Sequence, residues 1–170
     1  MILGVMSDTH GNRALMHRAA DQMMQDAGTE CILHLGDDYT DGEELGMAGY
    51  PVQFVPGLSC AAYRNPRVPN MRLLEVEGLA IAFAHDIRDI RGPGQAAHIV
   101  LVGHTHEASI AMRGGAIHVN PGHLKASVHR GESPSYATIQ IGPETVHVFV
   151  HELDGAIRES AVFPRADLAG

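Results

Sequence analysis

The chain has few cysteines, few basic side chains and no long hydrophobic run. Cys31 and Cys60 are its only thiols, too few for the disulfide framework of a small secreted domain. Its 12 Lys and Arg are outnumbered by 20 Asp and Glu, and the formal net charge of -8 argues against a broad basic surface for nucleic acid or anionic membrane. Apolar segments such as 79–84 and 99–103 end well short of the roughly 20 residues that a membrane helix needs. We therefore expect a soluble protein with small or local partners.

The overall length and the first residues indicate organisation and location. With 170 residues and 45% apolar content, the chain fits a single domain over 1–170 with one core of ordinary size. The segment MILGVM at the start reads as a strand and is unlike a basic, apolar leader, which together with the scarcity of cysteine predicts a cytoplasmic protein. The tail 154–170 shows no clear pattern, and homo-oligomerisation stays open.

Strand and helix patterns alternate in the first half. Residues 1–6 and 31–36 read as buried strands, and 51–55 reads as a third. Apolar residues at helical spacing predict a helix over 12–27, and 41–48 fits a short helix with acidic residues near its start. This β-α-β-α-β order implies a parallel sheet.

The second half is mostly β. It holds one isolated apolar strand at 98–103 and three paired segments, namely 71–85, 109–120 and 136–153. The turns of these pairs are predicted at residues 77–78, 114–115 and 142–143, where glycine occurs in each case. We expect the two halves to pack as two sheets covered by helices, which is an α/β fold.

Metal-ligand side chains follow the ends of the predicted strands. These are Asp8, His10, Asp37, His85, His104 and His106. Functional groups cluster at such strand ends in α/β proteins, and a spacing of two on an extended chain places both members of a pair on one side. Imidazoles bind transition metals, while a carboxylate such as Asp37 can bridge two divalent ions. The pattern predicts a site with two cations, which suits displacement at phosphorus by water.

Five short motifs carry a family resemblance. They are SDTHGN at 7–12, GDD at 36–38, the single His85, GHTH at 103–106 and NPG at 120–122. In this order they resemble the calcineurin-like metallophosphoesterases over about residues 1–150. More narrowly, the chain resembles their small single-domain phosphodiesterase branch, which also includes a retromer scaffold subunit.

The resemblance implies a four-layer αββα sandwich of two mixed sheets flanked by helices, with a binuclear metal site at one edge. It implies that a metal-bound hydroxide hydrolyses the phosphoester. Carried over by position, one metal would be held by Asp8, His10, Asp37 and His106, and the other by Asp37, His85 and His104. Asn12 matches the family's asparagine near the substrate. His123 follows NPG, where a small hydroxyl residue is more usual, so it either binds substrate or is an exposed loop histidine. Manganese is the expected ion, with iron, nickel and zinc as alternatives.

One motif departs from the family pattern. The segment VPGLSC at 55–60 places Leu58 where the branch usually has an asparagine that ligates the second metal. Leucine has no donor or acceptor, so the second site is expected to be weaker. The vacant ligand position could be filled by water, by the thiolate of Cys60, or by a shifted Asn65 or Asn70. We favour water.

Two functions remain in view. The first is a metal-dependent phosphoesterase, with phosphodiester substrates favoured. The alternative is a catalytically weak or silent metal-binding scaffold for protein partners, which Leu58 supports and the retained ligands oppose. His34 is interpreted as a core or supporting histidine. The other histidines are read as surface or core fillers, namely His17, His98, His118, His129, His147 and His151.

Overall fold

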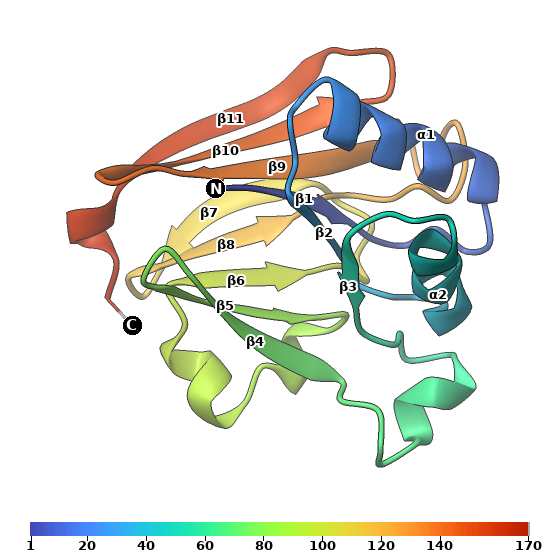
Figure 1. Cartoon of the computed structure of the whole chain (residues 1–170), viewed down its shortest axis with the longest axis horizontal. Coiled ribbons are helices and arrows are strands. Elements are labelled where there is room, and N and C mark those ends of the chain that lie inside the picture. Colours follow the sequence, from blue (N-terminus) through green and yellow to red (C-terminus); the bar gives the residue numbers. More distant parts are fainter. Residues whose placement is uncertain (170) are drawn as a thin grey trace.

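Two β-sheets packed face to face form the centre of the protein. The computed structural model describes residues 1–169. Figure 1 shows α1 (Arg13–Gln25) and α2 (Tyr39–Met47) together on the outside of one sheet, while only short helical turns lie outside the other. The prediction of an α/β sandwich with two mixed sheets is confirmed.

The first sheet has six strands in the order β11-β10-β9-β1-β2-β3. Its parallel part consists of β1 (Ile2–Met6), β2 (Cys31–His34) and β3 (Val52–Phe54). Its antiparallel part consists of β9 (Ser135–Ile141), β10 (Thr145–Glu152) and β11 (Ile157–Pro164). The two parts join where β1 pairs with β9, so the sheet is mixed.

Apolar side chains hold the two helices against this sheet. Met16, Ala19 and Met23 recur at helical spacing on the buried face of α1, where they pack in one cluster with Met6 and Ile32 of the sheet. The helix predicted over 12–27 and the short helix predicted over 41–48 are confirmed to within a few residues.

The second sheet has five strands in the order β4-β5-β6-β8-β7. Their bounds are β4 (Met71–Val76), β5 (Leu79–Ala84), β6 (Ile99–Val102), β7 (Ser109–Arg113) and β8 (Ala116–Asn120). The predicted hairpins are confirmed, because β4 pairs antiparallel with β5 and β7 with β8. Short 3-10 turns cover part of its outer face at η2 (Ile87–Asp89) and η3 (Gly92–Ala96).

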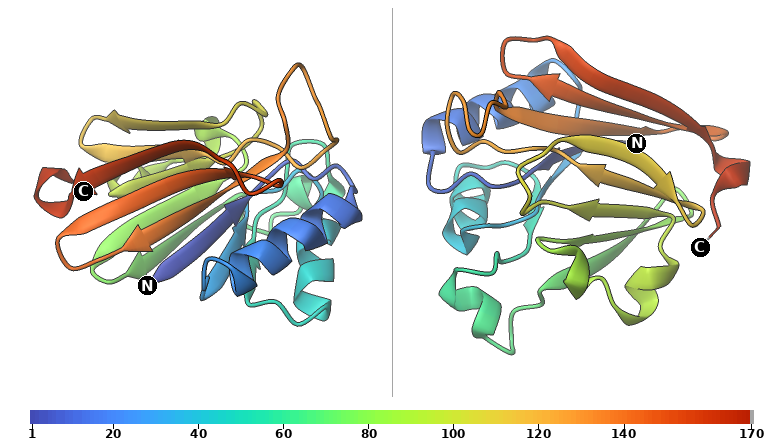
Figure 2. Two further views of the ribbon diagram at one scale, coloured as in Figure 1. Left: turned by 90° about the horizontal axis from the view of Figure 1, so that it is seen from above. Right: turned by 180° about the vertical axis from the view of Figure 1, so that it is seen from behind.

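The core lies between the sheets and fixes where the loops meet. Alternate residues such as Leu101 of β6 and Ile139 of β9 face inward and are fully buried. The strands β5, β6 and β8 are mutually parallel, as are β1 and β2. Their carboxyl ends gather at one edge of the sandwich, beside the helices (Figure 1). The segment 121–134 between β8 and β9 loops out at the same edge (Figure 2).

The tail that gave no clear pattern forms β11, the edge strand of the six-stranded sheet. In β11, Val162 is 56% exposed and Ile157 is 57% exposed. The apolar residues of this strand therefore do not indicate which of its faces is buried. Within residues 154–169, only Phe163 and Leu168 pack against the central core. Within residues 1–169, no helix has the length and apolar character required to cross a membrane.

Candidate metal centre

The loop after β1 presents Asp8 and His10. Both have left-handed backbone conformations, with φ of 55° and 47°, and His104 and His106 each have a φ of 68°. Such conformations are uncommon outside glycine and concentrate at functional sites. The prediction that each pair lies on an extended chain is wrong, because these residues lie in turns. The pairs still converge.

Five of the predicted ligands form one contact network. His106 Nε2 lies 3.1 Å from Asp8 Oδ1 and 3.2 Å from His10 Nε2, and His10 Nδ1 lies 2.7 Å from Asp37 Oδ2. His85 Nε2 lies 3.9 Å from Asp8 Oδ1 and 4.0 Å from Asp37 Oδ1. Ligand atoms of Asp8, His10 and His106 all fall within 4.8 Å of one another. Four separate chain segments thus meet at one point.

His85 has the hydrogen bonding expected of a metal ligand. Its Nδ1 lies 3.0 Å from the carbonyl oxygen of Leu35, which can only accept a hydrogen bond. The proton therefore sits on Nδ1, and Nε2 offers its lone pair toward Asp8 and Asp37. Because the His85 side chain is 2% exposed, this orientation is fixed by packing.

His104 lies at the margin of the network. Its ring centroid is 5.2 Å from that of His85, and its Nε2 is 3.8 Å from Asp86 Oδ2. The backbone N–H of His104 donates to Asp8 Oδ2 at 2.9 Å. Its side chain is 48% exposed, whereas that of Asp8 is 1% exposed. The prediction that it binds a second metal remains a prediction.

Asp8 carries a charge that the protein alone does not satisfy. Burial raises its pKa, but the interactions with His106 and His85 outweigh burial, so the pKa lies below its ordinary value and the carboxylate is ionised near neutral pH. Its Oδ1 is buried without a hydrogen-bond donor. A buried, ionised carboxylate oxygen that makes no well-aligned hydrogen bond, although His106 Nε2 lies 3.1 Å away, fits a divalent cation.

Two glycines permit the close approach of the loops at this centre. A Cβ on Gly57 would lie 2.3 Å from Asp37 Cα, and one on Gly103 would lie 2.7 Å from Asp8 Oδ2. Contacts this short do not occur with real side chains, so each position requires glycine. A Cβ at Gly57 would therefore displace the Asp37 backbone, and one at Gly103 would displace the side chains of Ser7 and Asp8.

A buried polar network supports the loop 8–11. Thr9 donates its hydroxyl to Asp41 Oδ2, which also accepts the N–H of Gly11 at 3.1 Å. His34 accepts the N–H of Gly36 at Nδ1, so its Nε2 carries the proton that it donates to Thr9 Oγ1 at 3.2 Å. Burial lowers the pKa of His34 to about 4, which keeps it neutral. The interpretation of His34 as a supporting histidine agrees with these contacts.

The segment with Leu58 lies directly against this centre. The N–H of Gly57 donates to the carbonyl of Asp37 at 3.0 Å, and the half-buried Leu58 follows it in the chain. Cys60 is a free, half-buried thiol and is absent from the group formed by Asp8, His10 and His106. Asn65 uses its side-chain oxygen to accept the N–H of Arg67 within its own loop.

Asn12 and His123 occupy different positions around the centre. Asn12 caps α1 by accepting the N–H of Leu15 at 3.3 Å, and its amide donates to the carbonyl of Lys125 at 2.9 Å. His123 is fully buried, and its ring centroid lies 5.9 Å from that of His106. Contact of either residue with substrate remains a prediction.

Sequence reasoning missed His129. It was read as a filler, yet its ring lies 4.8 Å from His106 and 5.4 Å from His123. Both His123 Nδ1 and His129 Nε2 are buried atoms without a hydrogen-bond partner. Its spacing from the other motifs gave no signal, because the loop 121–134 brings His129 next to His106, which lies on another loop.

The chain belongs to the calcineurin-like phosphoesterase superfamily, whose domain model matches residues 1–143. This family is metal-dependent, and the cluster around Asp8 is a candidate metal-ligand set. No curated protein matches the chain in a sequence search.

Solved structures share the fold at low sequence identity. YfcE, a phosphoesterase from E. coli, is 20% identical with a TM-score of 0.71, and the match covers 95% of this chain and 98% of that one. Vps29 from Entamoeba histolytica, in a single-mutant form, is 18% identical with a TM-score of 0.71, covering 96% and 99%. An archaeal phosphodiesterase is 17% identical with a TM-score of 0.65, covering 96% and 100%.

The first prediction concerns the support of the loop 8–11. Thr9→Val keeps the side-chain shape but removes the hydroxyl that links His34 to Asp41, so metal affinity should fall about 10- to 100-fold. A manganese titration monitored by calorimetry measures the change in metal affinity. Thr40→Val, at an exposed position of α2, is the matched control. Equal affinity in the two variants would show that the network does not position the ligands.

The second prediction concerns the approach of Gly57 to Asp37. Gly57→Ala should displace the Asp37 backbone and lower metal occupancy, because the added Cβ overlaps main-chain atoms that cannot rotate away. Gly46→Ala is the control, since the nearest atom to its Cβ would be 3.7 Å away. Elemental analysis after dialysis gives the occupancy. Full occupancy in Gly57→Ala would contradict the close-packing argument.

Proposed function

We propose that this protein is a binuclear metal-dependent phosphoesterase that acts on phosphodiesters. The observation that carries the proposal is the convergence of Asp8, His10 and His106 around a buried carboxylate oxygen without a donor. Membership of the superfamily supports a phosphoesterase, and the archaeal phosphodiesterase among its structural neighbours supports diester substrates.

The proposal assigns the ligands as follows. One cation would be held by Asp8, His10, Asp37 and His106, and the other by Asp37, His85 and His104. When bound, such cations supply Lewis acidity that activates water and stabilises charge on phosphoryl oxygens. Manganese is the ion to test first, with iron, nickel and zinc next. The Nδ1 hydrogen bond from His85 to Leu35 and the contact of His10 with Asp37 orient the imidazoles.

We propose that histidines on the loop 121–134 form hydrogen bonds with the phosphoryl group of the substrate. His123 and His129 each have a ring nitrogen without a partner, and both lie beside His106. Burial lowers the pKa of each, which favours the neutral form as a hydrogen-bonding group. Asn12 links this loop to α1 through Lys125 and so places it over the centre.

A second candidate function is a metal-binding scaffold with little or no turnover. Leu58 favours it, because the side chain cannot ligate a metal or contact a phosphate. The retained ligand network favours the enzyme, since a scaffold has no need for an ionised carboxylate buried without a donor. We weigh the enzyme above the scaffold, and place the protein in the cytoplasm as a proposal drawn from its composition.

The third prediction separates these functions. The wild-type protein should hold at least one manganese ion and hydrolyse bis(4-nitrophenyl) phosphate. Leu58→Asn should increase occupancy of the second site, because it restores an amide oxygen beside the Asp37 loop. Elemental analysis and a chromogenic assay report both quantities, and Leu73→Asn at an exposed leucine of β4 is the control. The enzyme proposal fails if wild type and Leu58→Asn are inert on mono- and diesters with every divalent ion tried.

The fourth prediction tests the ligand assignment directly. His10→Ala should remove about one ion per chain while leaving the circular dichroism spectrum unchanged, because His10 lies in a partly exposed loop outside the core. His147→Ala, on β10 far from the loop 8–11 in the sequence, should retain its metal. Metal content that is unchanged in His10→Ala would refute the assignment.

A further inference from the structure

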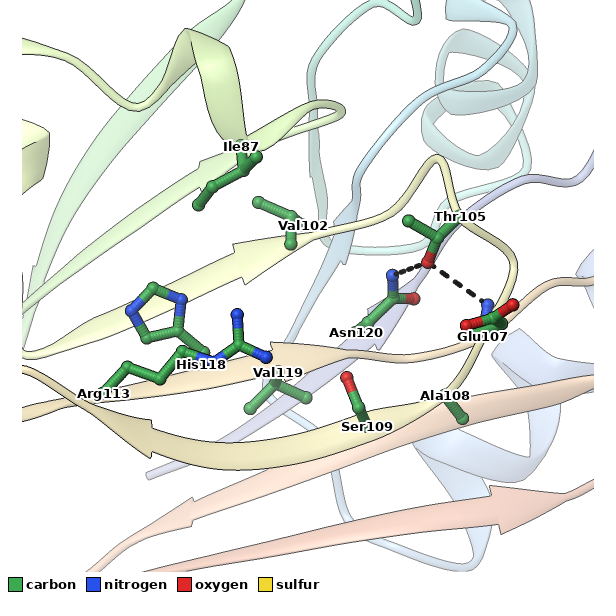
Figure 3. Close-up of a pocket in the computed structure, with 10 residues that line it drawn as sticks. All are labelled: Ile87, Val102, Thr105, Glu107, Ala108, Ser109, Arg113, His118, Val119 and Asn120. Carbon is green, nitrogen blue, oxygen red and sulfur yellow. Dashed lines mark hydrogen bonds between the residues drawn. The ribbon is translucent and has the colours of Figure 1, made fainter.

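A cavity of about 370 Å³ lies on the outer face of the second sheet, bounded by residues around the ends of β6, β7 and β8 (Figure 3). Its volume falls in the range of small-molecule sites. Its lining has four apolar side chains and six polar ones. The apolar ones are Ile87, Val102, Ala108 and Val119. None of the predicted metal ligands lines it, so it is a separate feature from the metal centre.

One end of the cavity is built on the same chain segment as the ligands. Thr105 lies between His104 and His106 in the chain, and its hydroxyl accepts a hydrogen bond from the amide of Asn120 at 2.9 Å. The same amide donates to the carbonyl of Gly103 at 2.9 Å. Asn120 is 5% exposed, so it fixes this end of the cavity against the chain segment that carries His104 and His106.

The other end of the cavity carries Arg113 and His118. Figure 3 shows the guanidinium of Arg113 beside the His118 ring and directed toward the middle of the cavity. His118 precedes Asn120 by two residues of an extended strand, which is about 7 Å. Within residues 1–169, no carboxylate lies within 4.0 Å of Arg113, although three other arginines have such partners. The guanidinium is therefore available to an occupant.

The two ends of the cavity carry side chains of opposite charge. Glu107 lies at the end near the metal centre, and Arg113 lies at the far end (Figure 3). Burial lowers the pKa of His118, and the positive charge of Arg113 lowers it further, so His118 is a neutral hydrogen-bonding group there. An anionic group would avoid Glu107 and bind the guanidinium through charge-assisted hydrogen bonds.

Building on the proposed phosphoesterase function, we propose that this cavity binds the leaving group of the substrate and selects leaving groups that carry a second anionic group. In the reaction, the oxygen of water bonds to phosphorus, the bond from phosphorus to the leaving oxygen breaks, and that oxygen takes a proton. The cavity forms no covalent bond. Arg113 acts as a specificity residue that holds the remote carboxylate or phosphate.

Matched esters test this proposal. Methyl 4-carboxyphenyl phosphate carries the anionic group, and methyl 4-carbamoylphenyl phosphate is its neutral counterpart of similar size. Arg113→Met should lower kcat/KM for the carboxylate ester about tenfold and leave that for the carbamoyl ester within twofold, because only the first uses a charge-assisted hydrogen bond. Arg67→Met, at an exposed loop position outside the cavity, is the control. A third ester with a phosphate in place of the carboxylate shows which anion binds better.

Failure of the cavity and failure of the enzyme give different results. If the esters are hydrolysed but Arg113→Met leaves the ratio of their kcat/KM values unchanged, the leaving-group cavity is refuted and the phosphoesterase stands. If no ester is hydrolysed, the proposed function fails. Calorimetry with 4-hydroxybenzoate and 4-hydroxybenzamide then decides on the cavity alone. If 4-hydroxybenzoate binds and Arg113→Met weakens its binding, the cavity is an anion site. If it does not bind, or binds wild type and Arg113→Met equally, the anion site is refuted.

Discussion

The burial of the Asp8 carboxylate is the constraint on which the rest of the site depends. A carboxylate that leaves water is costly unless opposite charge and hydrogen bonds replace the lost solvation. One oxygen receives the N–H of His104, and the other is left facing the His106 imidazole without a donor. The fold maintains this arrangement because β1 delivers Asp8 between two sheets, where neighbouring loops close over it. A cation at this point converts an unfavourable burial into a favourable one.

Holding such a group requires support from residues that never touch the cation. The left-handed conformations of Asp8 and His10 cost free energy, so something must stabilise them. Thr9 lies between them and is fixed by His34 and Asp41, while Asp41 also holds the N–H of Gly11. One buried network thus connects the loop after β1 with the loop after β2, which carries Asp37.

Much of the fold could be predicted from the sequence because its periodicity is strong. Helical spacing in α1 and glycine turns in the hairpins are local signals, and both were sufficient. The strand β11 could not be predicted in this way, because an edge strand with Val162 and Ile157 exposed lacks an apolar alternation. The ligand types at strand ends predicted their convergence, but the local geometry was missed because nothing in the spacing indicates a positive φ. His129 was missed for a related reason, since its neighbour His106 lies on a different loop.

The position of Leu58 also explains why two metal sites in one centre need not be equally strong. Asp37 is common to both proposed sites, but the remaining ligands differ in how firmly the protein holds them. Asp8 is 1% exposed and is enclosed by neighbouring loops, whereas the His104 side chain is 48% exposed and contacts Asp86 only at 3.8 Å. Arg88 holds Asp86 by hydrogen bonds that lower its pKa to about 2, so that carboxylate is already paired. Leu58 follows Gly57, which packs on Asp37, and it offers no ligand atom to the proposed second site. The proposed set around Asp8 has all four of its ligands.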